Sequence, residues 1–291
     1  MAESRRNSGF VLIMVLVVLA LAGGLLGLCA HRTSRRALAA GVAQRDLQRK
    51  WGTRSLETLC LPQAEAILRK QSVNEDGPCA AVRRSFDLGG VTFDVVVADE
   101  TAKANLNQIA ADRGRGGLRH AVATLGEGRW PLQVILRPCE QPTGIIRTPP
   151  VQYASLEQVF AGASSGDLLG NGSDRPGPSE RLTCWGNGKV HFRRAPAPVL
   201  QEMLVGILTH YEVYRLEALR DDDPMLGLEE LLTKLELEKE TREAARRRLT
   251  SRSTCHSLWI VIHGLTRSWY RLAVRQEADA ENDVGRWTFV W

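Results

Sequence analysis

An uninterrupted apolar run near the N-terminus constrains this chain more than any other feature. The run extends from Phe10 to Ala30, holds 21 residues without a charge, and follows a polar segment that carries Arg5 and Arg6. A helix rises about 1.5 Å per residue, so about 20 apolar residues cross the hydrocarbon core of a bilayer. The run therefore predicts a membrane-spanning helix over residues 10–30.

The residues around the run leave several routes of N-terminal processing open. A secretory signal would be cut after Ala20-Leu21-Ala22, whereas a signal anchor would stay uncut. A lipoprotein site at Cys29 is disfavoured, because bulky Leu28 precedes it. The remaining junction is Ser8-Gly9 before Phe10, where a basic leader ends in Gly and a membrane-length helix follows. This arrangement resembles the class III signal of type IV pilins and type II secretion pseudopilins, which a prepilin peptidase cuts after the Gly.

Composition places the rest of the chain among ordinary folded proteins. The 291 residues are 44% hydrophobic and 24% charged, and the net charge of +5 does not argue for nucleic acid. Outside the apolar run there are five cysteines, an odd number, so at least one thiol stays free or pairs between chains. Their pairing is left open; they are Cys60, Cys79, Cys139, Cys184 and Cys255. None of the spacings is a C-x-x-C or zinc pattern, so the cysteines predict no metal site.

Hydrophobic periodicity predicts the first elements after the anchor. Apolar residues recur at helical spacing from residue 34 to residue 71, and Gly52 and Pro62 are expected to bend or break this helix. Next, Ser85–Leu88 and Val91–Ala98 flank a two-residue Gly-Gly turn, the pattern of a β-hairpin.

The remainder predicts helices and then strands. We expect a long loop over 161–180, a helix from about Pro198 to residue 220, and further helices over 228–249. Three terminal β runs follow at 258–262, 269–274 and 287–291. The prediction is an α+β fold in which an N-terminal membrane helix joins a pilin-like antiparallel sheet with an inserted, mainly helical domain. The expected boundaries are a leader at 1–9, the membrane helix at 10–30, a helical spine with the first hairpin at 31–98, the insertion at 99–250 and the last strands at 251–291.

Three internal segments carry a more specific resemblance. Residues 95–107 read Val-Val-Val-Ala-Asp-Glu-Thr-Ala-Lys-Ala-Asn-Leu-Asn, and residues 182–200 contain Thr-Cys-Trp-Gly-Asn-Gly-Lys-Val before Ala-Pro-Ala-Pro-Val-Leu. Residues 249–253 read Leu-Thr-Ser-Arg-Ser, ahead of a strand. In order and spacing these segments resemble the minor pseudopilin K of type II secretion systems. The matching positions, which we expect to be structural, are Asp99, Glu100, Asn105, Asn107, Trp185, Gly186, Ala195 and Pro196.

The resemblance also gives meaning to Met14, the fifth residue if Phe10 opens the mature chain. Most pilins carry Glu there, to meet the terminal amine of a neighbouring subunit, whereas the K-type subunit lacks it. A subunit without that carboxylate suits the end of a filament, and it places no unpaired charge in hydrocarbon. The alternative is that Met14 is one more lipid-facing residue.

Other features point to neither catalysis nor a cofactor. The histidines are scattered singly, and no G-x-S-x-G elbow, H-E-x-x-H or phosphate loop is present. The carboxylates of 277–283 could collect calcium, but they lack the spacing of an EF-hand, and a solvated turn is favoured. A basic helix face is read as solvated or as contacting an acidic subunit, rather than nucleic acid. It comprises Arg242, Arg246, Arg247, Arg248 and Arg252.

The chain also differs from the family's motifs at several positions. Arg193-Arg194 replaces the family's Asn-Thr before Ala-Pro, and residues 110–150 are short for the family, so no calcium ligands are transferred. The resemblance implies a non-enzymatic tip subunit of the pseudopilus in the bacterial inner membrane, with its folded part in the periplasm. Its partners would be other minor pseudopilins, the inner-membrane platform and prepilin peptidase, which would precede methylation of Phe10. The alternatives are a minor subunit of a type IV pilus and a single-pass periplasmic protein that binds a ligand. The sequence does not name the secreted cargo.

Overall fold

The structure is a computed structural model. It describes residues 4–74, 79–127, 130, 153–160, 162–170, 176–264, 268–277 and 285–290. Two compact units divide the chain, Met1–Gly52 and Thr53–Trp291, and each is described by itself.

The first unit is helical from residue 4 onward. Helix α1 spans Ser4–Cys60, and its large apolar side chains between Phe10 and Leu28 are exposed. Among the described residues, α1 is the one helix that is long and apolar enough to cross a membrane. The predicted N-terminal apolar helix is therefore confirmed, while the expected break at Gly52 is wrong. One Gly costs only about 1 kcal/mol inside a helix, which good helix formers around it offset.

Pro62 does interrupt the helical segment, as predicted. Residues 61–63 form a turn, and α2 then spans Ala64–Asn74. Pro lacks the amide donor that would continue the helix, and its ring clashes with the preceding turn.

Five strands form one antiparallel sheet in the order β1-β2-β7-β8-β9. Their bounds are Ala81–Leu88, Val91–Asp99, Cys255–His263, Ser268–Gln276 and Gly285–Val290. Gly89 and Gly90 connect β1 to β2 with φ angles of 63° and 78°, the positive values that a type I′ turn requires. The predicted hairpin and the three terminal strands are confirmed, each longer than its sequence pattern indicated.

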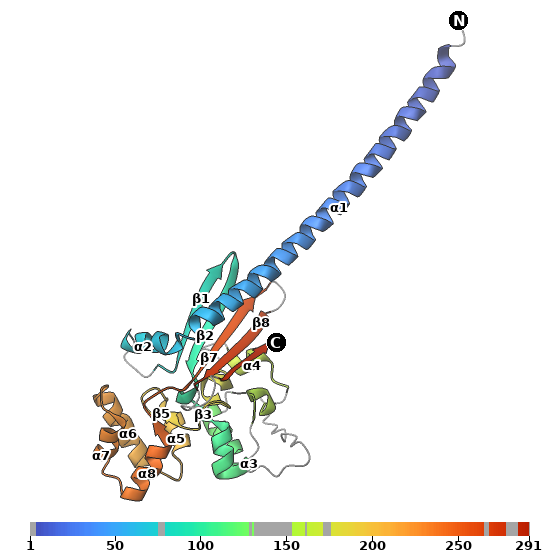
Figure 1. The fold of residues 1–291 in the computed structure, drawn as a ribbon. Helices are drawn as coiled ribbons and strands as arrows, with labels where there is room; N and C mark the ends of the chain where they lie inside the picture. The colour runs from blue at the N-terminus through green and yellow to red at the C-terminus, as the bar shows by residue number, and fades with distance from the viewer. Residues whose placement is uncertain are drawn as a thin grey trace. The chain divides into compact units, whose positions relative to one another are not determined.

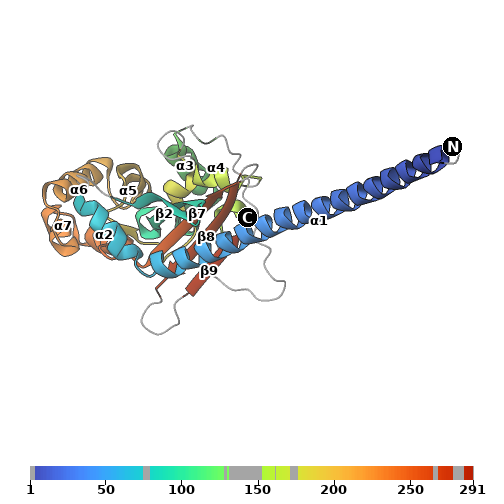
Figure 2. The ribbon, with the colours of Figure 1, turned by 90° about the horizontal axis from the view of Figure 1, so that it is seen from above.

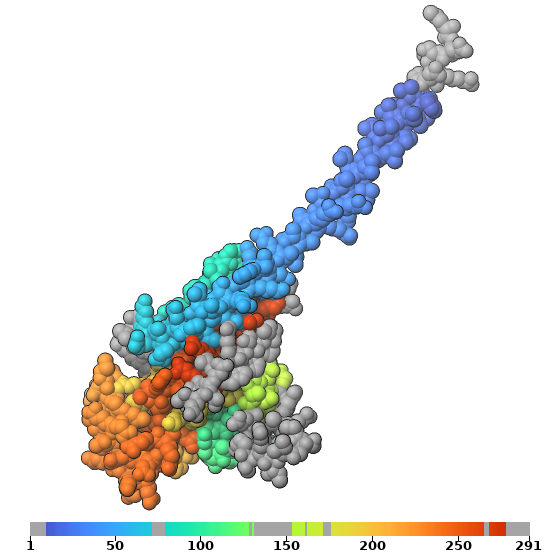
Figure 3. All heavy atoms as spheres, in the orientation of Figure 1, coloured from blue at the N-terminus to red at the C-terminus, as the bar shows by residue number. Residues whose placement is uncertain are grey.

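The chain between β2 and β7 is mainly helical. It also contains two small parallel pairs, β3-β4 and β5-β6. The elements are η1 (Glu100–Ala102), β3 (Ala104–Asn105), α3 (Leu106–Gly126), η2 (Leu156–Gln158), α4 (Ser165–Leu169), η4 (Pro178–Glu180), β4 (Leu182–Thr183), β5 (Val190–His191), α5 (Ala197–Met203), α6 (His210–Asp222), α7 (Leu228–Lys234), α8 (Lys239–Arg248) and β6 (Leu249–Thr250). In the space-filling view, the segment from α6 to α8 forms one orange lobe (Figure 3). The α+β fold with helices between two parts of the sheet agrees with the prediction.

Two details of the predicted helices are wrong. The segment 161–180 is not one loop, because α4 and η4 lie within it, and Ser164 and Asp167 form a capping box at the start of α4. The single helix expected from Pro198 is two helices, α5 and α6. Between them Gly206 takes a φ of 79°, and Thr209 begins α6 with a second capping box.

The sheet carries a different hydrophobic cluster on each face, because successive side chains of a strand point to opposite faces. Val95 and Val97 of β2, with Leu258 and Ile260 of β7, belong to the cluster that includes α2. Val96 and Trp259 belong instead to the larger cluster, which includes the helices between β2 and β7. Figure 1 shows the strands side by side, and Figure 2 shows α2 on one side of them and α3 and α4 on the other.

Candidate functional site

The candidate site has two separate parts. The first is the N-terminal segment with the proposed junction. Gly9, Phe10 and Met14 all lie in α1, where the side chain of Phe10 is 68% exposed and that of Met14 is 54% exposed.

The second part is formed by the three internal segments, which the structure brings together. Strand β3 pairs in parallel with β4, so Asn105 lies opposite Thr183. Strand β5 pairs with β6, so Val190 lies opposite Leu249. These pairings bring together residues that are about 60 to 80 positions apart in sequence, close enough for backbone hydrogen bonds.

Two asparagines of the first segment bind the backbone of the second. Asn105 Nδ2 donates to the carbonyl of Trp185 at 2.8 Å, and its Oδ1 caps the first turn of α3 by accepting from the Gln108 amide. Asn107 Nδ2 donates to the carbonyls of Cys184 and Tyr153 at 2.7 and 3.0 Å, while its Oδ1 accepts from the Tyr153 amide at 2.6 Å. An amide side chain suits this role because it both donates and accepts.

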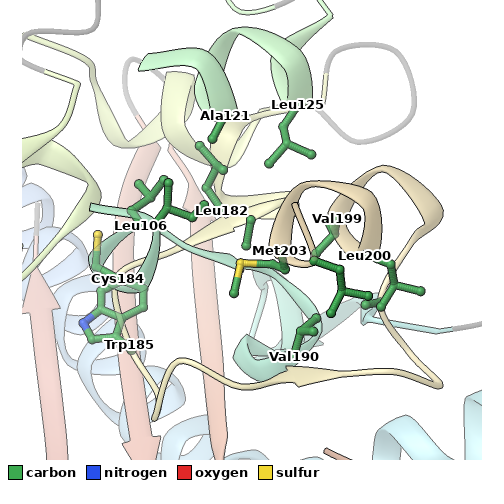
Figure 4. Close-up of a cluster of buried hydrophobic side chains, with 14 of the residues drawn as sticks. Leu106, Ala121, Leu125, Leu182, Cys184, Trp185, Val190, Val199, Leu200 and Met203 are labelled. Carbon is green, nitrogen blue, oxygen red and sulfur yellow. The ribbon is translucent and has the colours of Figure 1, made fainter. Parts of the chain in front are cut away.

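Apolar side chains of the same segments belong to one buried hydrophobic cluster (Figure 4). Leu106 and Leu182 are fully buried, and they belong to the same cluster as Val199 and Leu200 of α5. Trp185 is 8% exposed, and its indole N–H donates to the carbonyl of Ala154 at 3.0 Å. The amide of Gly186, whose φ is 94°, donates to Gln276 Oε1 of β8.

The Ala195-Pro196 pair lies where β5 leads into α5. Ala195 is fully buried; its amide donates to the His191 carbonyl, and its own carbonyl accepts from Arg220 at 2.9 Å. Pro196 is the N-cap residue of α5, and its carbonyl accepts from the amides of Val199 and Leu200.

Asp99 is the centre of a buried polar cluster. Its Oδ1 accepts from the Thr101 and Ser253 hydroxyls at 2.5 Å, and its Oδ2 lies 3.2 Å from Arg194 Nη1. Arg194 also forms a two-pronged ion pair with Glu65 of α2, both contacts being 2.7 Å long. The planar guanidinium fits a carboxylate in this bidentate way. Asp99 is fully buried and Arg194 nearly so, which means that each charge is compensated where water is excluded.

Neighbouring charges and burial shift the pKa values of the side chains in and around this cluster. Burial by itself would raise the pKa of Glu65, but hydrogen bonds from His256 and Arg194 and their charges lower it to about 2. Burial alone would lower the pKa of Arg194, whereas Glu65 and Asp99 raise it above its usual value. Burial lowers the pKa of His191, so that side chain is held neutral.

Glu100 forms a second buried pair next to the first. Its Oε1 lies 2.5 Å from Lys103 Nζ and accepts from the Ser257 hydroxyl at the same distance. The side chains of Lys103 and Glu100 are 2% and 1% exposed. Glu100 Oε2 is also buried and has no hydrogen-bond partner among the described residues.

Together these contacts connect the chain between β2 and β7 to the sheet. The segments of the resemblance contain Asp99, Glu100, Lys103 and Ser253, but not the partners Glu65 and Ser257. Lys103 lies within the first segment, three residues after Glu100. Arg194 stands where the resemblance expects another residue, and its ion pairs explain why a basic side chain fits there.

The remaining sequence features have different outcomes. The described cysteines Cys29, Cys60, Cys79, Cys184 and Cys255 are free thiols, and Cys139 lies outside the described residues. Burial raises the pKa of Cys184 and of Cys255. No group of three or more potential metal ligands occurs within the described part of the chain, and most of the acidic loop 277–283 lies outside that part.

The basic face of α8 is largely compensated within the protein. Arg246 forms a forked ion pair with Glu229, and Arg248 pairs with Asp112 at 2.6 Å. Arg252, just beyond the helix, pairs with Glu277 at 2.9 Å. These contacts give the arginines a role in packing α8 and its flanking segment.

Comparisons with known proteins were made by sequence and by structure. No family model matches the chain, and no curated protein matches it in sequence. Among solved structures, the chain is similar to a chain in the crystal structure of the GspK-GspI-GspJ complex from the type 2 secretion system of enterotoxigenic Escherichia coli. The identity is 14%, the TM-score is 0.49, and the alignment covers 86% of this chain and 99% of the other. The function is therefore argued from the motifs and the geometry of this chain.

Proposed function

We propose that this protein is a minor pseudopilin of the K type, located at the tip of a type II secretion pseudopilus. In this role it helps to start pseudopilus assembly and the export of folded proteins across the outer membrane. It is a structural subunit and not an enzyme. The observation that carries the proposal is the Gly9-Phe10 junction, which lies where the apolar part of α1 begins. The large side chains of that apolar part are exposed.

An exposed apolar helix of this length needs a bilayer or other helices around it. Cleavage after Gly9 would keep the entire apolar helix on the mature protein, which a secretory signal peptidase would not do. The helix could then reside in the inner membrane before assembly and pack against the helices of other pseudopilins afterwards. The folded part would face the periplasm, and prepilin peptidase and the inner-membrane platform would be further partners.

The apolar fifth residue supports the position at the tip. Met14 carries no carboxylate that could pair with the terminal amine of a subunit ahead of it, so no subunit is needed there. The buried ion pairs of Asp99, Glu100 and Arg194 support a structural role for the motif residues, because these charges are used in holding the fold together.

The test is the N-terminus of the protein purified from its own membrane. The proposal predicts a chain that starts at Phe10 and carries one added methyl group, as measured by intact mass and N-terminal sequencing. Gly9→Val should block processing, because a branched side chain does not fit where the peptidase accepts Gly, whereas Gly9→Ala should still be cut in part. A wild-type chain that starts at Met1 or Gly23, or normal processing of the Val variant, would contradict the proposal.

Two alternative functions predict different results for the N-terminus of the protein or for deletion of its gene in the native bacterium. A minor subunit of a type IV pilus would also start at Phe10, but its deletion would remove pili and leave protein secretion intact. A single-pass periplasmic protein that binds a ligand would keep Met1. Loss of secreted protein on deletion, restored by the wild-type gene, is the result expected for the pseudopilin.

A further inference from the structure

A pocket of about 280 Å³ opens at the edge of the large sheet, beside β1. One wall is a row of side chains on three neighbouring strands, because Arg83 pairs with Val96 and Val96 with Trp259 in the register. The other wall comes from α4 and η4, through Leu169, Ser179 and Glu180. The pocket is at the small end of the range for ligand sites, about 300–1,000 Å³, so it suits one side chain better than a larger molecule.

The interior of the pocket is apolar and its charges are already compensated. Val96, Leu169 and Trp259 contribute apolar surface that is less than 10% exposed. Lys103 Nζ is paired with Glu100, and Arg83 Nη2 lies 3.9 Å from Glu180 Oε1. A charged guest would therefore be buried without a counter-charge, which is costly. The chemistry favours a neutral, apolar side chain.

The adjacent edge of β1 offers unpaired backbone groups. In the described sheet β1 pairs with β2 alone. The Asp99 amide donates to the Ala80 carbonyl, so even-numbered residues of β1 bind β2. The amides and carbonyls of Ala81, Arg83 and Ser85 consequently point away from β2. Their side chains point to the face of the pocket, since Ala81 and Arg83 line it.

Charged side chains on this strand limit unselective pairing. Arg83 and Arg84 are exposed, and Arg84 Nη1 donates to the Arg83 carbonyl at 3.2 Å, a surface contact that an incoming amide can replace. Arginines of this kind discourage edge-to-edge aggregation. A segment that also fills the pocket would gain apolar burial that an arbitrary strand would not. Ser179, which is 5% exposed, also lines the pocket.

We propose that β1 and its pocket bind an extended segment of another protein, which adds to the sheet as an antiparallel strand and inserts one apolar side chain, such as Leu, into the pocket. Main-chain hydrogen bonds supply affinity in this mode of recognition, and the pocket supplies selectivity. In an antiparallel pair, directly opposed residues that exchange hydrogen bonds have their side chains on the same face. The residue that fills the pocket is therefore also one that bonds to β1. The proposal does not depend on the pseudopilin role.

The test uses the full chain in detergent micelles and a fluorescein-labelled peptide, acetyl-Thr-Val-Thr-Leu-Thr-Val-Thr-amide, with empty micelles as the blank. Fluorescence anisotropy should show saturable binding. Replacing the central Leu with Ala should weaken binding at least tenfold, because three buried carbons are lost. Methylating the Leu amide nitrogen should weaken it at least tenfold as well, because that amide faces β1.

A matched pair of protein variants tests where the peptide binds. Ala81→Phe fills the pocket from an exposed position of β1 and should weaken peptide binding at least tenfold. Arg84→Phe puts the same side chain on the opposite face of the same strand and should change binding less than threefold. Circular dichroism establishes that both variants are folded.

Three results would overturn the proposal. The first is the absence of binding to the wild type at a peptide concentration of about 1 mM. The second is equal binding by the methylated peptide or by Ala81→Phe. The third is self-association of the wild type that Ala81→Phe abolishes while the peptide does not bind, which would assign the edge to a second copy of this chain.

Discussion

Lys103→Met tests whether the buried Lys103–Glu100 pair holds the fold together. The ammonium and the carboxylate oxygen are 2.5 Å apart, and both side chains are almost completely buried. Met keeps much of the apolar stem of Lys and removes the charge. Glu100 would then keep the Ser257 hydroxyl as its only partner among the described contacts of its carboxylate.

The size of the effect follows from this burial. Removing one partner of a buried ion pair costs about 3–5 kcal/mol, because the other charge is left uncompensated. For a folded unit of this size, about 2–4 °C per kcal/mol converts this to a lowering of Tm by about 6–20 °C. Thermal unfolding of the full chain in micelles, followed by near-ultraviolet circular dichroism, measures the change.

Two further variants make the reasoning refutable. Lys103→Met/Glu100→Gln removes both charges and should recover at least about half of the lost stability, since a neutral amide is less costly to bury. Lys234→Met breaks an exposed pair, with Glu230 at 3.6 Å, and should cost less than about 1 kcal/mol. If the double variant were as unstable as Lys103→Met, loss of packing rather than an unpaired charge would be the cause.

Two other predictions concern the same region. Glu65→Gln removes a carboxylate whose pKa is lowered to about 2, and because the Glu65 side chain is 52% exposed, solvent screening reduces its contribution to about 1 kcal/mol. That contribution is present above the ordinary pKa of 4.5 and is lost as the pH falls through 2, so urea unfolding should separate wild type from variant at pH 7 but not at pH 2. Asn107→Leu removes the hydrogen bonds of the Asn107 amide to Cys184 and Tyr153, and it should cost about 2–3 kcal/mol in the same assay, whereas a change below about 0.5 kcal/mol would show that water replaces the amide.

Local sequence patterns were sufficient for elements whose signals are local. The Gly89-Gly90 turn between alternating strands predicted the hairpin, and the apolar run predicted the N-terminal helix. The helix expected from Pro198 failed because its apolar spacing continues across Gly206, where the chain turns with a positive φ. Tyr211 and Tyr214 continue the same helical spacing, yet both are more than 60% exposed. The spacing of apolar residues alone does not reveal that two successive helices bury different faces.

The cluster around Asp99 could not be predicted from spacing, because most of its members are far apart in sequence. Arg194 meets Glu65 across 129 positions, and Ser253 meets Asp99 across 154. No short motif contains both members of either pair. The resemblance includes Asp99, Glu100 and Lys103, whereas only the fold shows that Arg194 pairs with both Asp99 and Glu65.

The way these clusters connect the folded unit indicates a structural role for their charges. Arg194, just after β5, binds both Glu65 of α2 and Asp99 at the end of β2, so one guanidinium joins three separate parts of the folded unit. The oxygens of Asp99 accept from Arg194 and from the Thr101 and Ser253 hydroxyls, and Lys103 neutralises Glu100. A general acid or base needs a proton that it can exchange with a bound substrate, whereas these carboxylates are buried against fixed partners. Their effect is to hold the inserted helices rigidly on the sheet. A rigid folded unit that follows an exposed apolar helix is what a subunit needs if its helix is to pack among others while its surface presents a defined edge such as β1.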